Sequence, residues 1–475
     1  MLLRCSDNQY SLDCQSKVRL NEGELLNTRS ISLKLLSRGL TISNVVFKSS
    51  IRDSEHPSED LLLFERDIVP GPIDLYDELS EGVVVEVQDR IGRQFLNTVV
   101  GRYANRLPAG KSTIKLIDRS VDLDLDENES FGDGRMGNCL HGGNDGFDLK
   151  DFVKVGADSE IVKRFEEETR KSCREERDEV NVHDRKISYF YLKSPAGHQG
   201  FPESLDILAT ISISINDDND DDDYDGDGDG DPSDTDQILL GLLKFDLKAM
   251  ISSEDDDDGD GKRAKSINQT CGKTPVNLTW HTGYLLNDFS DLTYDQNHGI
   301  RNHQLWINSD YHLVTDDHQL PTGEIAPNSS QNLNLNQRVE SSNFLEIKDN
   351  LTDKGLDHCF LFNRKRGNKD TSHDDDDDEP KVILKRKSVK KENNEEEELM
   401  LIFRSNQSSI QCYTSEHFSG TKIPRKTIHR FKTDQSLSKN DDEDHDSQRQ
   451  NYYNSQGNFT INKSDKTIKH EQLNG

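Results

Sequence analysis

Five short motifs in this chain carry side chains that can exchange protons or hydrogen bonds with a ligand. The first is Thr274–Asn287, a strand-like apolar run with His281 near its middle. A histidine has an unperturbed pKa near neutrality, so it can hold or release a proton under ordinary conditions. A single histidine at a strand is more often structural, so the other motifs decide whether a site forms around His281.

Two of the other motifs lie in the first third of the chain. A segment bounded by glycines, Gly101–Gly110, contains Arg102, Asn105 and Arg106. Further on, His141 precedes a glycine pair, where backbone and a planar donor can both approach a ligand closely. Taken singly, the arginines also fit surface ion pairs and the glycine pair also fits a plain turn.

The last two motifs lie near the end of the chain. Asp357 and His358 stand just before a short apolar run, and Gln411 lies inside another. Asn, Arg, His, Asp and Gln together match the hydroxyl donors and acceptors of a polyhydroxylated ligand. A reaction on a sugar would need neither a metal nor a nucleotide, and the chain has no Walker-type glycine loop and no Gly-x-Ser-x-Gly elbow. We therefore expect no cofactor and no metal.

The ordered set of motifs resembles the aldose 1-epimerase (galactose mutarotase) family. Single motifs are moderately specific, but the ordered series, from about residue 31 to 422, is highly specific. The resemblance rests on Gly101–Lys111 (GRYANRLPAGK), Leu140–Phe147 (LHGGNDGF), Gly200–Leu205 (GFPESL), Thr274–His281 (TPVNLTWH), Ile307–Asp310 (INSD), Leu320–Ile325 (LPTGEI), Leu356–His358 (LDH) and Gln411–Thr414 (QCYT).

This resemblance implies a fold, a reaction and a set of site residues. The fold would be a large antiparallel β-sandwich of the galactose mutarotase-like supersandwich type, with a sugar cleft across one sheet. The reaction would interconvert the α and β anomers of aldohexoses such as glucose and galactose, in hexose and galactose metabolism. His281 matches the general acid that protonates the ring oxygen. Sugar-binding positions are matched by Asn105, Arg106, His141, Asp357 and Gln411.

The chain departs from the family pattern at several positions. Trp280 stands where the family usually has Asn, and Glu203 replaces a Gly. The family's general base is a Glu in a strand that follows the Gln-x-Tyr-Thr segment, and the polar sequence after Thr421 predicts no such strand. Glu416 and Glu471 are available carboxylates outside the expected motif, and the base is assigned to neither.

The sequence predicts that the secondary-structure elements carrying these residues are β-strands. Leu205–Ile215 has an apolar residue at every second position, as in a half-buried antiparallel strand. Ile31–Leu36 and Leu40–Phe47 alternate on either side of a glycine turn and predict a hairpin. Many short strands with few helices favour an all-β sandwich or barrel. Further strands are expected at 82–88, 186–192, 238–245, 303–308, 359–362, 381–384, 399–403 and 409–413.

Composition bounds the size of the ordered core. The chain has 475 residues, of which 31% are apolar and 31% are charged, with a net charge of −31. Runs of acid self-repel and bury too little apolar surface to become ordered, which leaves roughly 300 residues for one large domain. We expect a loose segment at 1–30, a sandwich domain at 31–432, low-complexity insertions near 155–185, 217–236, 253–265 and 364–378, and a polar, disordered tail at 433–475.

Composition and cysteine spacing also predict the binding partners, the cellular compartment and the oligomeric state. The acidic balance argues against binding to nucleic acid. Seven scattered cysteines without CxxC spacing fit free thiols in a reducing compartment, and the sequence predicts neither a signal peptide nor a membrane span. We expect a cytoplasmic monomer or weak dimer. Asp223–Asp231 partly matches a calcium loop but reads better as a low-complexity acidic loop.

Four functions remain open from the sequence. The first is a mutarotase in hexose metabolism. The second, favoured by the missing Glu, is a catalytically impaired sugar-binding or regulatory protein. The third is an epimerase of hexose 6-phosphates, which needs a cluster of cations beyond Arg102 and Arg106. The fourth is a mostly disordered interaction protein, which the ordered motifs and alternating strands argue against.

Overall fold

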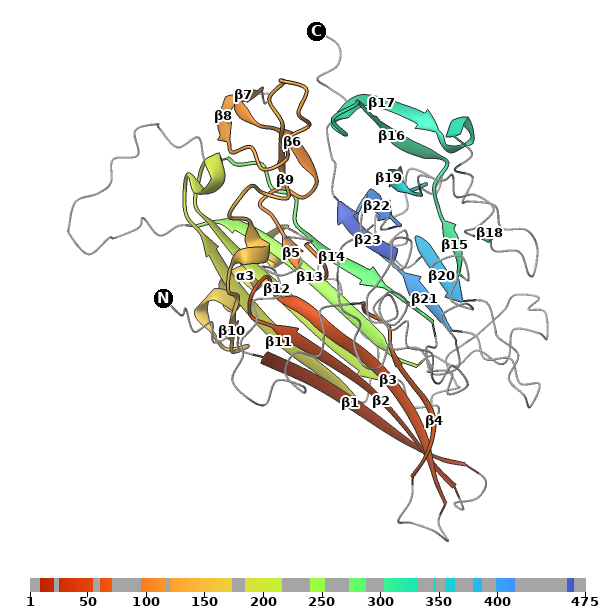
Figure 1. The fold of residues 1–475 in the computed structure, drawn as a ribbon. Coiled ribbons are helices and arrows are strands. Elements are labelled where there is room, and N and C mark those ends of the chain that lie inside the picture. Colours follow the sequence, from red (N-terminus) through yellow and green to blue (C-terminus); the bar gives the residue numbers. More distant parts are fainter. Residues whose placement is uncertain are drawn as a thin grey trace, which may run out of the picture.

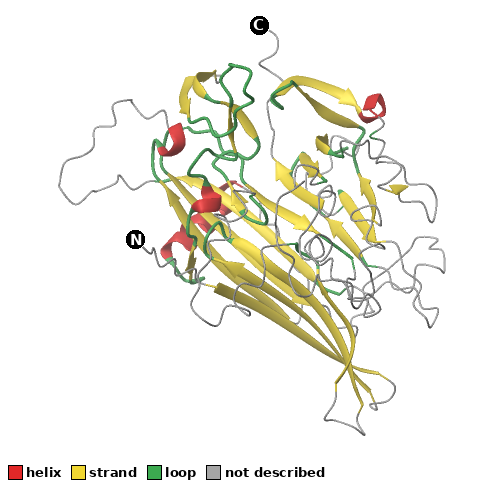
Figure 2. Cartoon of the chain, in the orientation of Figure 1, coloured by secondary structure: helices red, strands yellow, loops and turns green. Residues whose placement is uncertain are grey.

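Strands make up nearly all of the regular structure (Figures 1 and 2). The structure is a computed structural model. It describes residues 9–20, 25–53, 60–70, 95–115, 120–172, 184–215, 240–252, 273–287, 303–331, 333, 345–346, 355–363, 379–386, 399–414 and 459–464. Every strand pairing within these ranges is antiparallel.

One four-stranded sheet comes from the start of the chain. Its register pairs Ile31 with Phe47 and Leu36 with Thr41, which confirms the hairpin that the alternation predicts. The strands follow the chain order and are β1 (Gln9–Leu20), β2 (Leu25–Leu36), β3 (Thr41–Asp53) and β4 (Asp60–Asp67).

A second four-stranded sheet packs on the first. Its third strand has the bounds that the alternation predicts, because isoleucine and leucine at every second position bury one face. The strands are β10 (Val153–Val155), β11 (Asp184–Ser194), β12 (Leu205–Ile215) and β13 (Leu242–Ile251).

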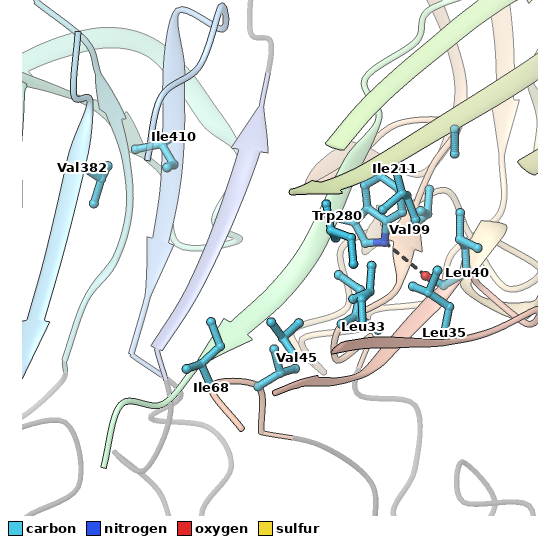
Figure 3. Close-up of a cluster of buried hydrophobic side chains, with 14 of the residues drawn as sticks. Leu33, Leu35, Leu40, Val45, Ile68, Val99, Ile211, Trp280, Val382 and Ile410 are labelled. Atoms are coloured by element: carbon cyan, nitrogen blue, oxygen red, sulfur yellow. Dashed lines mark hydrogen bonds between the residues drawn. The ribbon is translucent and has the colours of Figure 1, made fainter. Parts of the chain in front are cut away.

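A large part of the core lies between these two sheets. The rings of Tyr10 and Phe190 meet edge to face with centroids 5.1 Å apart, and Cys14 Sγ lies 3.5 Å from the carbonyl oxygen of Ile213. Figure 3 shows side chains of both layers, among them Leu33 and Ile211, meeting in one apolar cluster. The two packed sheets make the molecule an all-β sandwich, as expected.

The outer face of β12 differs from its prediction. The sequence indicates a half-buried strand, but only Thr210 is more than marginally exposed. Helix α3 (Glu160–Ser172) covers the outer face, and its Val162 and Phe165 pack against Leu208. The stretch 155–185, expected to be a low-complexity insertion, therefore contains an ordered helix that protects the sheet.

The remaining strands build a larger sheet and a smaller one beside it. The seven-stranded sheet has the order β17 (Pro321–Pro327), β16 (Tyr311–Thr315), β19 (Asp357–Leu361), β22 (Ser409–Tyr413), β23 (Phe459–Ser464), β14 (Thr279–Tyr284) and β5 (Val99–Val100). The smaller sheet has the order β18 (Leu345–Glu346), β15 (His303–Ile307), β20 (Val382–Arg386) and β21 (Met400–Phe403).

Two small antiparallel pairs stand at the upper end of the molecule, facing the β16–β17 hairpin (Figure 1). Three short 3-10 turns complete the described elements. The pairs are β6 (Arg106–Pro108) with β9 (Asn138–Leu140) and β7 (Gly110–Lys115) with β8 (Ser120–Leu125), and the turns are η2 (Phe147–Leu149), η3 (His198–Gly200) and η8 (Asn328–Gln331).

Both ends of the chain differ from expectation. The segment 1–30, expected to be loose, contains β1 and the start of β2; β1 is held because Leu12 and Cys14 are buried between the sheets. The tail 433–475, expected to be disordered, contains β23, which pairs with β14 and β22 inside the seven-stranded sheet. Backbone pairing on both sides holds this strand despite its polar sequence.

Some expectations fall outside the described residues. These are the strand at 82–88, the acidic insertions at 217–236, 253–265 and 364–378 together with the calcium-like loop, and most of the tail. Within the described part of the chain, no helix combines the length and the apolar composition needed to cross a membrane.

Candidate active site

Strand β14 presents two adjacent large side chains to opposite faces of its sheet. Trp280 points toward the sandwich core, where its Nε1 donates to the carbonyl oxygen of Leu40 at 3.1 Å and its ring meets Phe245 at 5.0 Å (Figure 3). His281, the next residue, lies on the other face because side chains alternate along a strand. The unusual Trp at position 280 therefore belongs to the core and does not replace a group of the site.

His281 is held firmly by its backbone while its ring is buried. Its N–H donates to Thr98 at 2.8 Å and its carbonyl accepts from Asn97 at 2.7 Å. The residue is 8% exposed, and its Nδ1 has no hydrogen-bond partner within the described part of the chain. Burial, which disfavours the charged ring, lowers the pKa of His281 to about 4. The imidazole is therefore neutral near pH 7.

A second histidine stands beside the first. The rings of His141 and His281 meet edge to face with centroids 5.1 Å apart, and Phe95 contacts His141 in the same way at 4.7 Å. The backbone N–H of Asn105 donates to Nδ1 of His141 at 3.0 Å. Because Nδ1 accepts this bond, the ring proton of a neutral His141 lies on Nε2. His141 thus has a fixed ring orientation and a fixed tautomer.

Three polar side chains continue this cluster across the sheet. Asn105 Nδ2 donates to Gln411 Oε1 at 3.2 Å, and Gln411 Nε2 donates to Asp357 Oδ1 at 2.7 Å. Asp357 and Gln411 lie on the paired strands β19 and β22. The amide of Gln411 is therefore oriented by a donor on one side and by a carboxylate on the other.

Arg106 joins the cluster through Asn105 and is itself clamped by an acid. Its Nη1 lies 3.5 Å from Asn105 Oδ1. Its Nε and Nη2 donate to the two oxygens of Glu129 at 2.7 and 2.8 Å. This fork-to-fork arrangement fixes the plane of the guanidinium group.

The backbone at this site adopts left-handed conformations that L-residues rarely use. Asn105 has φ 65° and His141 has φ 51°, while Phe95 and Asn97 have φ 56° and 60°. Such positions carry strain that the surrounding structure must hold, and they concentrate at active sites and ligand clamps. Four of them around His281 are an independent sign of a functional site.

The glycine pair after His141 has a different role from the one expected. A Cβ on Gly142, which has φ +89°, would lie 1.9 Å from the carbonyl oxygen of Gly101. A side chain at Gly143 would meet Gln199 at 2.6 Å. The pair therefore lets the backbone pack against other parts of the chain, whereas the sequence suggested a close approach to a ligand.

Arg102, the other arginine of its motif, is a structural residue. It is 1% exposed, and its guanidinium donates to the carbonyl oxygens of Ser194, Pro202 and Glu203 at 3.0, 2.7 and 2.7 Å. Burial lowers its pKa to about 10, which still leaves it charged. These bonds fix the loop between β11 and β12.

The structure brings all six sequence-predicted site residues into one contiguous network. They come from segments up to 306 positions apart. The residues are Asn105, Arg106, His141, His281, Asp357 and Gln411. Their roles toward a ligand stay predictions. The sequence motifs do not include Phe95 or Glu129. Glu129 is one of many acidic residues in the chain, and its spacing does not distinguish it from the others.

The register of β23 bears on the missing base. Position 462 pairs with His281 on β14 and with Gln411 on β22, so this strand occupies the place where the sequence predicted none. The residue at that position is Asn462, and β23 (FTINKS) contains no carboxylate. The carboxylates that the described residues bring into the network are Asp357 and Glu129, each already bonded to a neighbour.

Comparison with known families adds to this geometry. The family model described as aldose 1-epimerase matches residues 261–454, which include His281, Asp357 and Gln411. Over this region, which is less than half of the chain, the sequence is similar to the aldose 1-epimerase family. The match begins at residue 261, after Asn105, Arg106 and His141, so these three residues join the site through the contacts given above.

Three solved structures align with most of this chain at low sequence identity. A GalM/aldose epimerase homologue from C. elegans is 14% identical with a TM-score of 0.48, and the alignment covers 96% of this chain and 90% of that one. Galactose 1-epimerase from Lactobacillus acidophilus is 16% identical with a TM-score of 0.47 and the same coverage. A galactose mutarotase-like protein from Clostridium acetobutylicum is 11% identical with a TM-score of 0.39, covering 95% and 97%. A search of curated protein sequences found no significant match.

Proposed function

We propose that this protein is an aldose 1-epimerase that interconverts the α and β anomers of aldohexoses such as glucose and galactose, as a step of hexose metabolism in the cytoplasm. One observation carries the proposal. A continuous network links the histidine that matches the family's acid to a set of amide, guanidinium and carboxylate groups suited to sugar hydroxyls.

The reaction needs one proton donor and one acceptor. A base removes the proton of the anomeric hydroxyl while an acid protonates the ring oxygen, the ring C–O bond breaks, and an open-chain aldehyde forms. Rotation about the bond to the aldehyde carbon and reclosure give the other anomer. His281 is the proposed acid. Because its pKa lies near 4, the donor at neutral pH is the neutral ring N–H, and the proton returns on reclosure.

A second candidate function is sugar binding without turnover. The observation that favours it is Asn462, an amide at the register position opposite both His281 and Gln411. An amide cannot remove a hydroxyl proton, so the second candidate keeps the binding network and lacks the base.

Polarimetry separates the two candidates. Freshly dissolved α-D-glucose and α-D-galactose change rotation spontaneously, and an active enzyme accelerates that change in proportion to its concentration. Acceleration supports the enzyme. Sugar binding by calorimetry with only the spontaneous rate supports the binding protein, and neither binding nor acceleration rejects both.

Asn462→Glu sharpens this test. A carboxylate at the register position opposite His281 supplies a candidate base, so turnover should rise by about 10²-fold or more, the usual contribution of general base catalysis. Lys463→Glu is the matched control, because it adds a carboxylate one position away, opposite Ile410 on β22. An equal rise in both variants would reject the assignment of position 462.

A further inference from the structure

Glu129 is the one acidic partner that the described contacts give to Arg106. The side chains are 16% exposed for Arg106 and 22% for Glu129. Burial alone would raise the pKa of Glu129, but the hydrogen bonds and the charge of Arg106, with a further bond from Asn138, lower it. Glu129 is therefore ionised at neutral pH, and the pair as a whole carries no net charge.

The segment that carries Glu129 is fastened at both ends. Asn128 holds Leu140 through two hydrogen bonds, of 2.7 Å to the Leu140 N–H and 2.9 Å to its carbonyl oxygen. Asn138, which is fully buried, donates both to Glu129 at 3.0 Å and to the carbonyl oxygen of His318 at 2.8 Å. The carboxylate of Glu129 is thus fixed against the site by more than its bond to Arg106.

The middle of the same segment reaches across to the β16–β17 turn. The ring of Phe131 stacks on His318 with centroids 4.2 Å apart, and His318 Nε2 lies 2.8 Å from Asp133 Oδ2. Residues 126–138 therefore form a strap from Arg106 to the turn at 316–320. Figure 1 shows the pair β6–β9 facing the β16–β17 hairpin, which forms one edge of the sheet that carries β14 and β22.

The charged groups near the network of six site residues can now be summed. Arg102 is committed to backbone carbonyls, and Arg106 is neutralised by Glu129. His281 is neutral, and Asp357 contributes a carboxylate. A phosphate or carboxylate on the ligand would meet an arginine that is already paired, and it would have to displace an acid that the strap holds in place.

We propose that Glu129 is a specificity-determining residue: by pairing with Arg106 it restricts the site to uncharged sugars and excludes acidic or phosphorylated ones. This inference rests on the proposed function, because it assumes that the network binds an aldose. It assigns a role to a residue outside the sequence motifs, and it assigns to the strap the role of holding Glu129 against Arg106.

The test compares galactose with galacturonate, which carries a carboxylate in place of the C6 hydroxymethyl group. Binding of each sugar to the full chain is measured by calorimetry for wild type, Glu129→Gln and Glu129→Asp. Glu129→Gln should raise the galacturonate-to-galactose affinity ratio by about tenfold, the effect of one freed charge-assisted contact. Glu129→Asp keeps the charge and should retain the wild-type ratio.

Glu127→Gln is the matched control. Glu127 lies in the same strap and accepts from the N–H of Gly137 at 3.1 Å, away from Arg106, so the variant loses the same charge without freeing the arginine. An equal change of the ratio in Glu127→Gln would trace the effect to overall charge and overturn the proposal. An unchanged ratio in Glu129→Gln would overturn it as well.

A second arm separates this inference from the proposed function. Inorganic phosphate is titrated into the same variants, followed by phosphorus NMR. If wild type binds no sugar, the proposed function fails, and phosphate still reports on Arg106: binding gained in Glu129→Gln and absent in Glu127→Gln supports the role of Glu129. If Glu129→Gln gains no phosphate binding in that case, the role of Glu129 fails too.

Discussion

The two faces of β14 do different things with adjacent residues. On one face Trp280 lies in the apolar core and satisfies its only polar atom on the carbonyl of Leu40. On the other face His281 is buried nearly as deeply, yet its Nδ1 has no partner among the described residues. A buried polar atom without a partner costs stability, and a ligand hydroxyl at this face would supply the missing hydrogen bond.

The same contrast holds for the two halves of the molecule. The sandwich of β1–β4 and β10–β13 is held by contiguous apolar packing between regular strands. The site is assembled from polar side chains on β6, β14, β19 and β22 and on residues with left-handed backbone. Substitutions in the first half should therefore change stability, and substitutions in the second should change binding and turnover.

The largest expected effect is on turnover. His281→Ala removes the proposed proton donor, so the rate of anomer interconversion should fall by about 10²- to 10⁴-fold. Stability should fall as well, because the substitution removes a buried ring that packs on His141 and leaves a cavity. Polarimetry measures the rate, and thermal unfolding measures the stability. An active wild type whose rate survives this substitution would remove His281 as the acid.

The next effect is on stability, one residue away. Trp280→Phe removes the bond to Leu40 and leaves part of the indole volume empty, so the free energy of unfolding should fall by about 1–3 kcal/mol. Turnover should change less than twofold, since Trp280 faces away from His281. Urea unfolding and polarimetry on the same preparation check the two readouts. A variant that loses turnover at unchanged stability would reverse the assignment of the two faces.

How far the sequence predicts this fold depends on the regularity of each strand. The bounds of β12 follow from strict alternation, and the hairpin of β2 and β3 follows from alternation on both sides of a glycine. The sequences of β1 and β23 (QYSLDCQSKVRL and FTINKS) are mostly polar and do not predict strands; pairing with neighbours holds both, and β1 also buries Leu12 and Cys14. Backbone hydrogen bonds leave no trace in a hydropathy pattern.

The sequence predicts those site residues that belong to recognisable motifs. The six site residues predicted from the motifs meet in the structure. Glu129 could not be found in this way, because one acid in a chain with ninety aspartates and glutamates has no distinguishing spacing. Arg102 shows the opposite failure: a motif residue whose type suggested a ligand, but whose guanidinium is fully used by the loop between β11 and β12.

A further expected effect is a change of stability with pH that belongs to His281. The folded protein keeps this ring neutral down to about pH 4, whereas the unfolded chain binds a proton below its ordinary pKa of 6.5. The unfolded state therefore binds more protons between these values, and stability falls as the pH falls from 6.5 toward 4. The contribution is at most about 1.4 kcal/mol per pH unit.

Because burial also lowers the pKa of His198 and His358, the wild-type slope contains their effects as well. Urea unfolding at pH 7.5, 6 and 5 on wild type and His281→Ala isolates the part due to His281, since the variant should lose less stability over this range. Parallel curves would mean that His281 takes up its proton in the folded protein near its ordinary pKa, and the neutral N–H donor would then be wrong.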